Sequence, residues 1–134
     1  LLDRLDLQVV VKRLEAAELS PSRQRTGQAA PPRPDSSVTV AARVLAARQR
    51  MQGRNPAGLG NGQLVGDALL EQSLLSREAE ELWQRAIAQR RLSARGAERV
   101  LRVARTIADL DDQPAVGTQA IAEALTYRSF DQPL

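Results

Sequence analysis

The chain has 134 residues, room for one domain and a linker, and its net charge of +3 is too small to indicate nucleic-acid binding by itself. It contains no cysteine and no histidine, which excludes a disulfide framework, thiol or Ser-His-Asp catalysis, and a Cys/His metal site. Hydrophobic residues make up 43% of the chain but aromatic residues only 2%, a composition that favours packed helices over a β-sandwich.

The composition also bears on where the protein works. The absence of cysteine is typical of intracellular proteins, and no apolar run approaches the roughly 20 residues of a membrane span. We also expect no signal peptide before the first segment. We therefore expect a cytoplasmic protein with no membrane partner. Because the chain does not begin with methionine, we also expect it to be a piece of a longer protein.

Residues 1–14 run apolar through Val9, Val10 and Val11, which predicts one short strand from Leu5 to Val11. A strand needs a partner for the hydrogen bonds of its ladder. This strand must therefore pair with a sheet outside the chain or be disordered.

Residues 15–37 contain four prolines among serine, glutamine, arginine and glycine. Such a composition restricts the backbone, removes hydrogen-bond donors and leaves little to bury, as in a flexible linker. We expect this linker to be mobile and the helical domain to follow it over residues 38–134.

Helix-capping residues followed by apolar residues at helical spacing predict a small all-α bundle of four to five helices. The expected helices are 38–52 after a Ser36 or Ser37 cap, a short one at 64–74, 76–90 capped by Ser76, 93–110 capped by Ser93, and 118–128 capped by Thr118. The first should bury a stripe made of Val40, Val44, Ala47 and Met51. The turn before Ser93 is very short, so the helices on either side of it should pack as a hairpin.

The helix predicted at 93–110 carries unusual residues at its start. Arg95 falls in the first turn, where the helix dipole disfavours a cation and favours a phosphate, and Gly96 beside it costs about 1 kcal/mol relative to alanine. This pattern predicts an anion close to the backbone. The alternative is a solvated basic face, because Arg91, Arg95, Arg99 and Arg102 share one side and charge runs on helices are usually solvated.

The carboxylates and loops hold no further catalytic pattern. Asp109, Asp111 and Asp112 crowd the end of the same helix, where we expect them to mark its exit into a turn, with Asp111 and Asp112 solvated. The chain has no GxxxxGK(S/T) phosphate loop and no supported acid/base pair. We therefore expect the chain alone to be no enzyme and to bind neither nucleotide nor metal.

Two segments together resemble one family. LLDRLDLQVVV at the start and LSARGAERVLRVARTIADL at 92–110 are similar to the C-terminal part of magnesium-chelatase-like AAA+ ATPases of the ComM type. In that family a segment close to GPLLDRIDLHVEV closes the ATPase core, and a helical lid follows that ends in a segment like EALTYR at 123–128. The resemblance covers nearly the whole chain, although Gln8 stands where the family usually has histidine and the linker matches only in character.

The resemblance implies a division of the chain and two site residues. Residues 1–14 would end the ATPase core, 15–37 would be the linker, and 38–134 the lid. Arg4 resembles the arginine finger presented to the nucleotide of a neighbouring subunit, and Arg95 resembles the sensor-2 arginine that reaches the ATP phosphates. Both roles suit a guanidinium, which offers a forked pair of charged donors to phosphate oxygens. Without the family, Arg4 would be read as a surface residue beside two aspartates.

For the complete protein, the resemblance implies a cytoplasmic, ring-forming and hexameric ATPase that uses ATP and Mg²⁺ and acts on DNA. Its partners would be the remaining AAA+ core of its own chain, the neighbouring subunits and DNA. Its work would be branch migration during natural transformation, and the family name implies metal insertion into a porphyrin as an alternative. Arg99 and Arg102 are expected to be solvated or at a subunit interface.

Two hypotheses from other classes remain open at this point. The first is an autonomous arginine-rich helical module that binds DNA, supported only by the basic face. It lacks interleaved aromatic residues for single strands and a clear helix with base-reading Asn or Gln. The second is a protein-interaction domain unrelated to ATPases.

Overall fold

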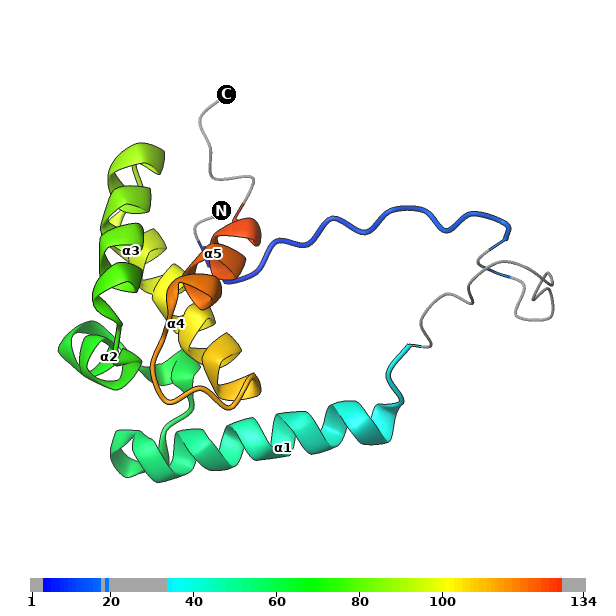
Figure 1. Cartoon of the computed structure of the whole chain (residues 1–134), viewed down its shortest axis with the longest axis horizontal. Helices are drawn as coiled ribbons and strands as arrows, with labels where there is room; N and C mark the ends of the chain where they lie inside the picture. Colours follow the sequence, from blue (N-terminus) through cyan, green and yellow to red (C-terminus); the bar gives the residue numbers. More distant parts are fainter. Residues whose placement is uncertain (1–3, 18, 20–33, 129–134) are drawn as a thin grey trace.

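The computed structural model describes residues 4–17, 19 and 34–128, and over these ranges the chain forms five α-helices and no β-sheet (Figure 1). The helices are α1 (Ser37–Arg54), α2 (Gly66–Ser73), α3 (Arg77–Arg90), α4 (Ala94–Leu110) and α5 (Thr118–Thr126). Two short 3₁₀ turns, η2 (Pro56–Gly58) and η3 (Asn61–Gln63), lie between α1 and α2. The predicted small all-α bundle is confirmed.

The helix starts follow the predicted caps in three of four cases. Ser36, Ser76 and Ser93 each accept a hydrogen bond from the backbone amide three residues further on, which satisfies a donor that the helix leaves unpaired. The fourth prediction is wrong: Gly117, in extended conformation, is the cap of α5, and Thr118 is already its first helical residue. Because glycine has no side chain to accept a bond, α5 begins without a side-chain cap.

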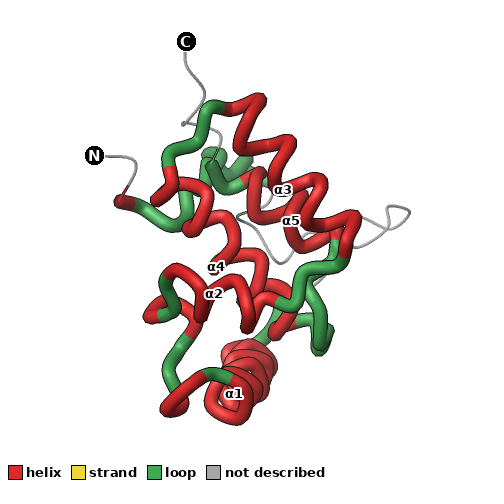
Figure 2. The backbone as a smooth tube through the Cα atoms, turned by 90° about the vertical axis from the view of Figure 1, so that its left-hand side faces the viewer, coloured by secondary structure: helices red, strands yellow, loops and turns green. Residues whose placement is uncertain are grey.

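Helix α4 lies at the centre of the domain (Figure 2). It packs against α1, α2 and α5, while α3 packs mainly against α5. The core is aliphatic, as the composition predicted, and its largest fully buried apolar side chains are Leu64, Leu69, Val100, Leu101, Val116 and Ile121. The element that carries the candidate anion site is therefore also the element on which the others pack.

The connection between α3 and α4 is as short as predicted. Arg91 ends α3 in the left-handed conformation, with φ of 52°, and turns the chain toward α4. Trp83 Nε1 donates to the carbonyl oxygen of Ala97 at 3.0 Å and ties the two helices together.

Only the C-terminal half of α1 packs against the rest of the domain. Of its predicted buried stripe, Ala47 is buried and Met51 half-buried, whereas Val40 and Val44 are 45% and 41% exposed. The N-terminal half of α1 extends beyond the bundle, so no described element covers it (Figure 1). The prediction of a continuous buried stripe is wrong for this half.

The strand predicted from Leu5 to Val11 is not formed either. Val9, Val10 and Val11 are 63%, 67% and 86% exposed, and the segment runs away from the bundle as an irregular chain (Figure 1). The reason is the one that the prediction named, since no strand within the described ranges lies beside it to complete a ladder. Most of the predicted linker, residues 18 and 20–33, and the end of the predicted lid, 129–134, lie outside the described residues.

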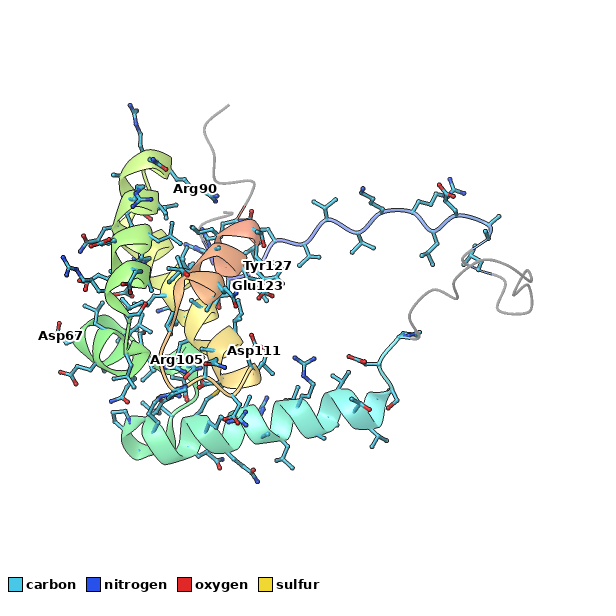
Figure 3. All side chains as sticks on the ribbon, in the orientation of Figure 1. Asp67, Arg90, Arg105, Asp111, Glu123 and Tyr127 are labelled. Atoms are coloured by element: carbon cyan, nitrogen blue, oxygen red, sulfur yellow. The ribbon has the colours of Figure 1, made fainter. Side chains whose placement is uncertain are left out.

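A buried ion pair joins α4 to its surroundings. Arg105 is fully buried, and its Nη2 lies 3.0 Å from Asp109 Oδ1, one helical turn further along α4 (Figure 3). Its two amino groups also donate to three carbonyl oxygens at 2.7–3.1 Å, those of Ser73, Gln113 and Pro114. Burial lowers the pKa of the Arg105 guanidinium, and the charge of Asp109 opposes that shift.

The carboxylate of Asp109 also accepts hydrogen bonds from α1 and η3. Arg54 of α1 donates to both of its oxygens, at 2.6 and 3.0 Å, and Asn61 of η3 donates to Oδ2 at 2.8 Å. The helix ends one residue after Asp109, as expected, and the Asp109 side chain is buried. Asp111 and Asp112 are exposed as expected, and Asp112 pairs with Arg50 at 2.9 Å.

We predict that Asp109→Ala destabilises the domain by about 3–5 kcal/mol, because it leaves Arg105 as a buried charge without its partner. Urea unfolding followed by circular dichroism measures the effect. Asp111→Ala removes an exposed carboxylate from the next turn and should change stability by less than about 0.5 kcal/mol. Equal effects of the two variants would contradict a special role for the buried pair.

Candidate functional site

Arg95 stands exposed at the start of α4, as the second residue of the helix. Within the described residues it forms no hydrogen bond or ion pair through its side chain. The amides of Ala94 and Arg95 have no partner inside a helix, because the Ser93 hydroxyl takes only that of Gly96, at 3.1 Å. The first turn of α4 thus offers two free amides, the positive end of the helix dipole and an unpaired guanidinium. These groups suit phosphate oxygens.

The neighbours of Gly96 leave room for a side chain. A Cβ at this position would lie 3.4 Å from Ser93 Oγ and 3.7 Å from Leu92 Cβ, which are ordinary van der Waals distances. The sequence predicted that an anion approaches the backbone here. Packing within the described residues does not require a glycine here, so Gly96 stays consistent with that prediction, and Arg95 and the free amides are the other observations behind it.

The other two arginines on this side of α4 are engaged within the chain. Arg99 is 18% exposed and pairs with Asp6. Arg102 is 13% exposed and donates to the carbonyl oxygen of Leu64 at 3.1 Å and to Glu98 at 3.4 Å. Of the two expectations for them, the solvated state is wrong, because each side chain is mostly buried and bonds within the chain. Contact with a neighbouring subunit stays a prediction.

The segment that follows Arg4 is attached to the helical domain at three points. Arg128 Nη1 donates to the carbonyl oxygen of Leu5 at 2.9 Å, Asp6 pairs with Arg99, and the amide of Gln8 donates to the carbonyl oxygen of Tyr127 at 2.8 Å. Tyr127 lies at the end of α5, where the N-terminal segment passes (Figure 3). The sequence did not predict these contacts, since no pattern pairs residues more than 90 positions apart.

Arg4 itself is exposed. The alternative to an arginine finger is a surface residue beside Asp3 and Asp6. Asp3 lies outside the described residues, and Asp6 pairs with Arg99, so the only ion pair shown for Asp6 is with the helix. Arg4 and Arg95 form no direct contact in the described structure, yet Asp6 joins the segment of one to the helix of the other.

The part of the chain that the structure describes holds no group of three acidic side chains close enough to bind a metal ion. In the same part of the chain, no helix combines the length and the apolar character that crossing a membrane requires.

Comparison with known proteins identifies the domain. Residues 34–128 match the family described as magnesium chelatase, subunit ChlI C-terminal. The chain belongs to this family. The resemblance inferred from the sequence is thereby confirmed: the chain corresponds to the C-terminal region of a ComM-type protein and is the helical lid of a magnesium-chelatase-like AAA+ protein.

Three relatives are each similar to the chain over a part of their own length. An uncharacterised protein of Salmonella typhimurium, YifB, is 35% identical over 100 residues, which cover 75% of the chain and 19% of YifB. Competence protein ComM of Haemophilus influenzae is 33% identical over 129 residues, 96% of the chain and 23% of ComM. An uncharacterised Mycobacterium tuberculosis protein, Rv2897c, is 34% identical over 130 residues, 96% of the chain and 24% of its own length. The chain therefore spans less than a quarter of these relatives.

We predict that Ser93→Ala lowers the free energy of unfolding by about 1 kcal/mol, because it removes the cap of α4. Arg95→Ala should change it by less than about 0.5 kcal/mol, since the exposed guanidinium contacts nothing described and a cation is unfavourable there. Urea unfolding of the two variants tests this. A loss for Arg95→Ala as large as that for Ser93→Ala would show that Arg95 has a structural role.

Proposed function

We propose that this lid supplies two arginines to ATP hydrolysis in a ring of identical subunits. Arg95 would bind the phosphates of ATP held by the core of its own chain, and Arg4 would reach the ATP of a neighbouring subunit. The observation that carries the proposal is the exposed, unengaged Arg95 at the start of α4, beside two free amides. A cation in this position is unfavourable until an anion arrives, so the arrangement suits a ligand better than it suits folding.

The chemistry agrees with both assignments. Phosphoryl transfer spreads negative charge over the phosphate oxygens, and a guanidinium meets them with two parallel donors that stay charged at any physiological pH. ATP and Mg²⁺ would be bound mainly by the AAA+ core, which lies outside this chain. The chain itself would add charge and orientation and no nucleophile.

For the complete protein we infer a hexameric, cytoplasmic motor that acts on DNA, in branch migration during natural transformation. The ComM-type resemblance and the competence protein among the relatives support this reading. Metal insertion into a porphyrin is the second candidate, supported by the family description. Stimulation of the ATPase by branched DNA favours the first reading, and stimulation by a porphyrin favours the second.

The remaining hypotheses lose support. An autonomous DNA-binding module depended on a continuous basic face, and the structure engages Arg99 and Arg102 of that face within the chain. An interaction domain unrelated to ATPases does not agree with membership of the magnesium chelatase family.

We predict that Arg95→Ala in the complete protein lowers kcat for ATP hydrolysis by about 10²-fold, the usual loss when one charge-stabilising donor is removed. Arg4→Ala should cost about 10³-fold or more, as for arginine fingers on similar chemistry. Arg95→Lys should recover little, because the ammonium keeps the charge and loses the planar fork. Steady-state phosphate release measures all three.

The matched control is Arg85→Ala, which removes an exposed arginine from α3 and should leave kcat unchanged. Arg102 is unsuitable as a control, because its side chain donates to the carbonyl oxygen of Leu64 and to the carboxylate of Glu98. Full activity of Arg95→Ala would contradict the proposed role. A loss for Arg85→Ala equal to that for Arg95→Ala would instead mean that the charge of the surface matters and not one arginine.

We also predict that the isolated chain binds no ATP at micromolar concentration, because it lacks a phosphate loop and Arg95 alone cannot hold a triphosphate. Isothermal titration of the chain with Mg·ATP checks this. Micromolar binding would contradict the assignment of the nucleotide site to the core.

A further inference from the structure

We propose that Asp6, Arg99 and Arg128 form a clamp that joins the segment carrying Arg4, at the end of the core, to the lid, so that the position of Arg4 depends on that of the lid. The inference rests on the proposed role of Arg4 and adds three positioning residues to it. None of the three is placed at the nucleotide. Their task would be to set where the finger points.

The first hold is on the backbone next to Arg4. Arg128, which is 1% exposed, donates from Nη1 to the carbonyl oxygen of Leu5 at 2.9 Å. Consecutive Cα atoms are about 3.8 Å apart, so a fixed Leu5 leaves the backbone of Arg4 little room to move. The side chain of Arg4 stays exposed and free to reach outward.

The second hold is an ion pair between Asp6 and Arg99 of α4. The Arg99 side chain is 18% exposed and that of Asp6 is 49% exposed, so the pair lies at the surface and acts together with the two backbone contacts. A third contact, from the amide of Gln8 to the carbonyl oxygen of Tyr127 at 2.8 Å, fixes the segment against the end of α5. Three bonds over four residues determine both position and direction, whereas a single bond would act as a pivot.

The clamp also connects the two candidate site residues. Arg95 and Arg99 lie four residues apart on α4, which places them about 6 Å apart along the helix axis and on the same side. A rotation of the lid that brings Arg95 toward a phosphate in its own subunit would carry Arg99, Asp6 and hence Arg4 with it. The clamp would thus link the nucleotide state of one subunit to the finger offered to the next.

The attachment itself is tested on the chain alone. The chain contains no cysteine, so a nitroxide label on Val9→Cys, an exposed position next to the clamp, is unique. We expect the label to broaden the amide signals of Tyr127 and Arg128 in NMR spectra. Asp6→Arg removes one of the three holds and places a like charge beside Arg99, so it should reduce this broadening, and the exchanged pair Asp6→Arg with Arg99→Asp should restore it. Broadening that Asp6→Arg leaves unchanged, or that fails to return in the exchanged pair, would overturn the clamp.

The catalytic consequence is tested in the complete protein. Misplacement of a catalytic group by about 1 Å can cost up to about 10²-fold, so we expect Asp6→Arg to lower kcat by at least about tenfold. The KM for ATP should stay within about twofold, because Asp6 does not contact nucleotide. The exchanged pair should recover most of kcat, which a merely destabilising substitution would not allow.

Different results would contradict the finger role of Arg4 and the clamp. If Arg4→Ala keeps full activity, the finger assignment is wrong and the clamp has nothing to position. If Arg4→Ala is inactive while Asp6→Arg keeps full kcat, the proposed function stands and the clamp is wrong. Arg85→Ala serves again as the exposed-arginine control, with unchanged kcat expected.

Discussion

The arrangement of the domain depends on one buried ion pair, Arg105 with Asp109. A charge removed from water is costly unless its donors find partners. Both amino groups of the guanidinium bond to the end of α2 and to the loop before α5, whereas its Nε has no hydrogen-bond partner within the described residues. The carboxylate bonds to Arg54 and Asn61, which brings in α1 and η3. Elements distant in sequence therefore share one pair of charges, and they meet correctly only in one arrangement.

A gradient of burial runs along α4. Arg95 in its first turn is exposed, Arg99 and Arg102 are 18% and 13% exposed, and Arg105 is fully buried. Four arginines of one helix therefore do three different things: one faces solvent, two tie neighbouring segments to the helix, and one organises the core. The buried end fixes the helix that carries Arg95 within the domain, and a well-supported helix suits the proposed contact of Arg95 with a phosphate.

The sequence predicted what depends on local chemistry and missed what depends on distant partners. Serine caps and helical spacing set the bounds of α3 and α4, because the bonds involved lie within four residues. The predictions of a buried stripe on α1 and a strand at Leu5 to Val11 were wrong, because each needs a surface that the described chain does not supply. The Arg105–Asp109 spacing was visible as an i, i+4 pair, and only the fold shows that it is buried.

The candidate site divides in the same way. Arg95 could be singled out from the sequence because a cation is unfavourable at the start of a helix. In the structure no anionic group of the described residues pairs with it. Asp6, Arg99 and Arg128 carried no such signal, because their partners lie 93 and 123 positions away. The three segments through which the chain resembles its family, 1–11, 92–110 and 123–128, contain all three residues of the clamp. In the fold these three segments contact one another through Asp6, Arg99 and Arg128. The proposed positioning of Arg4 relative to the helix that carries Arg95 would need all three residues, because each supplies one side of a contact.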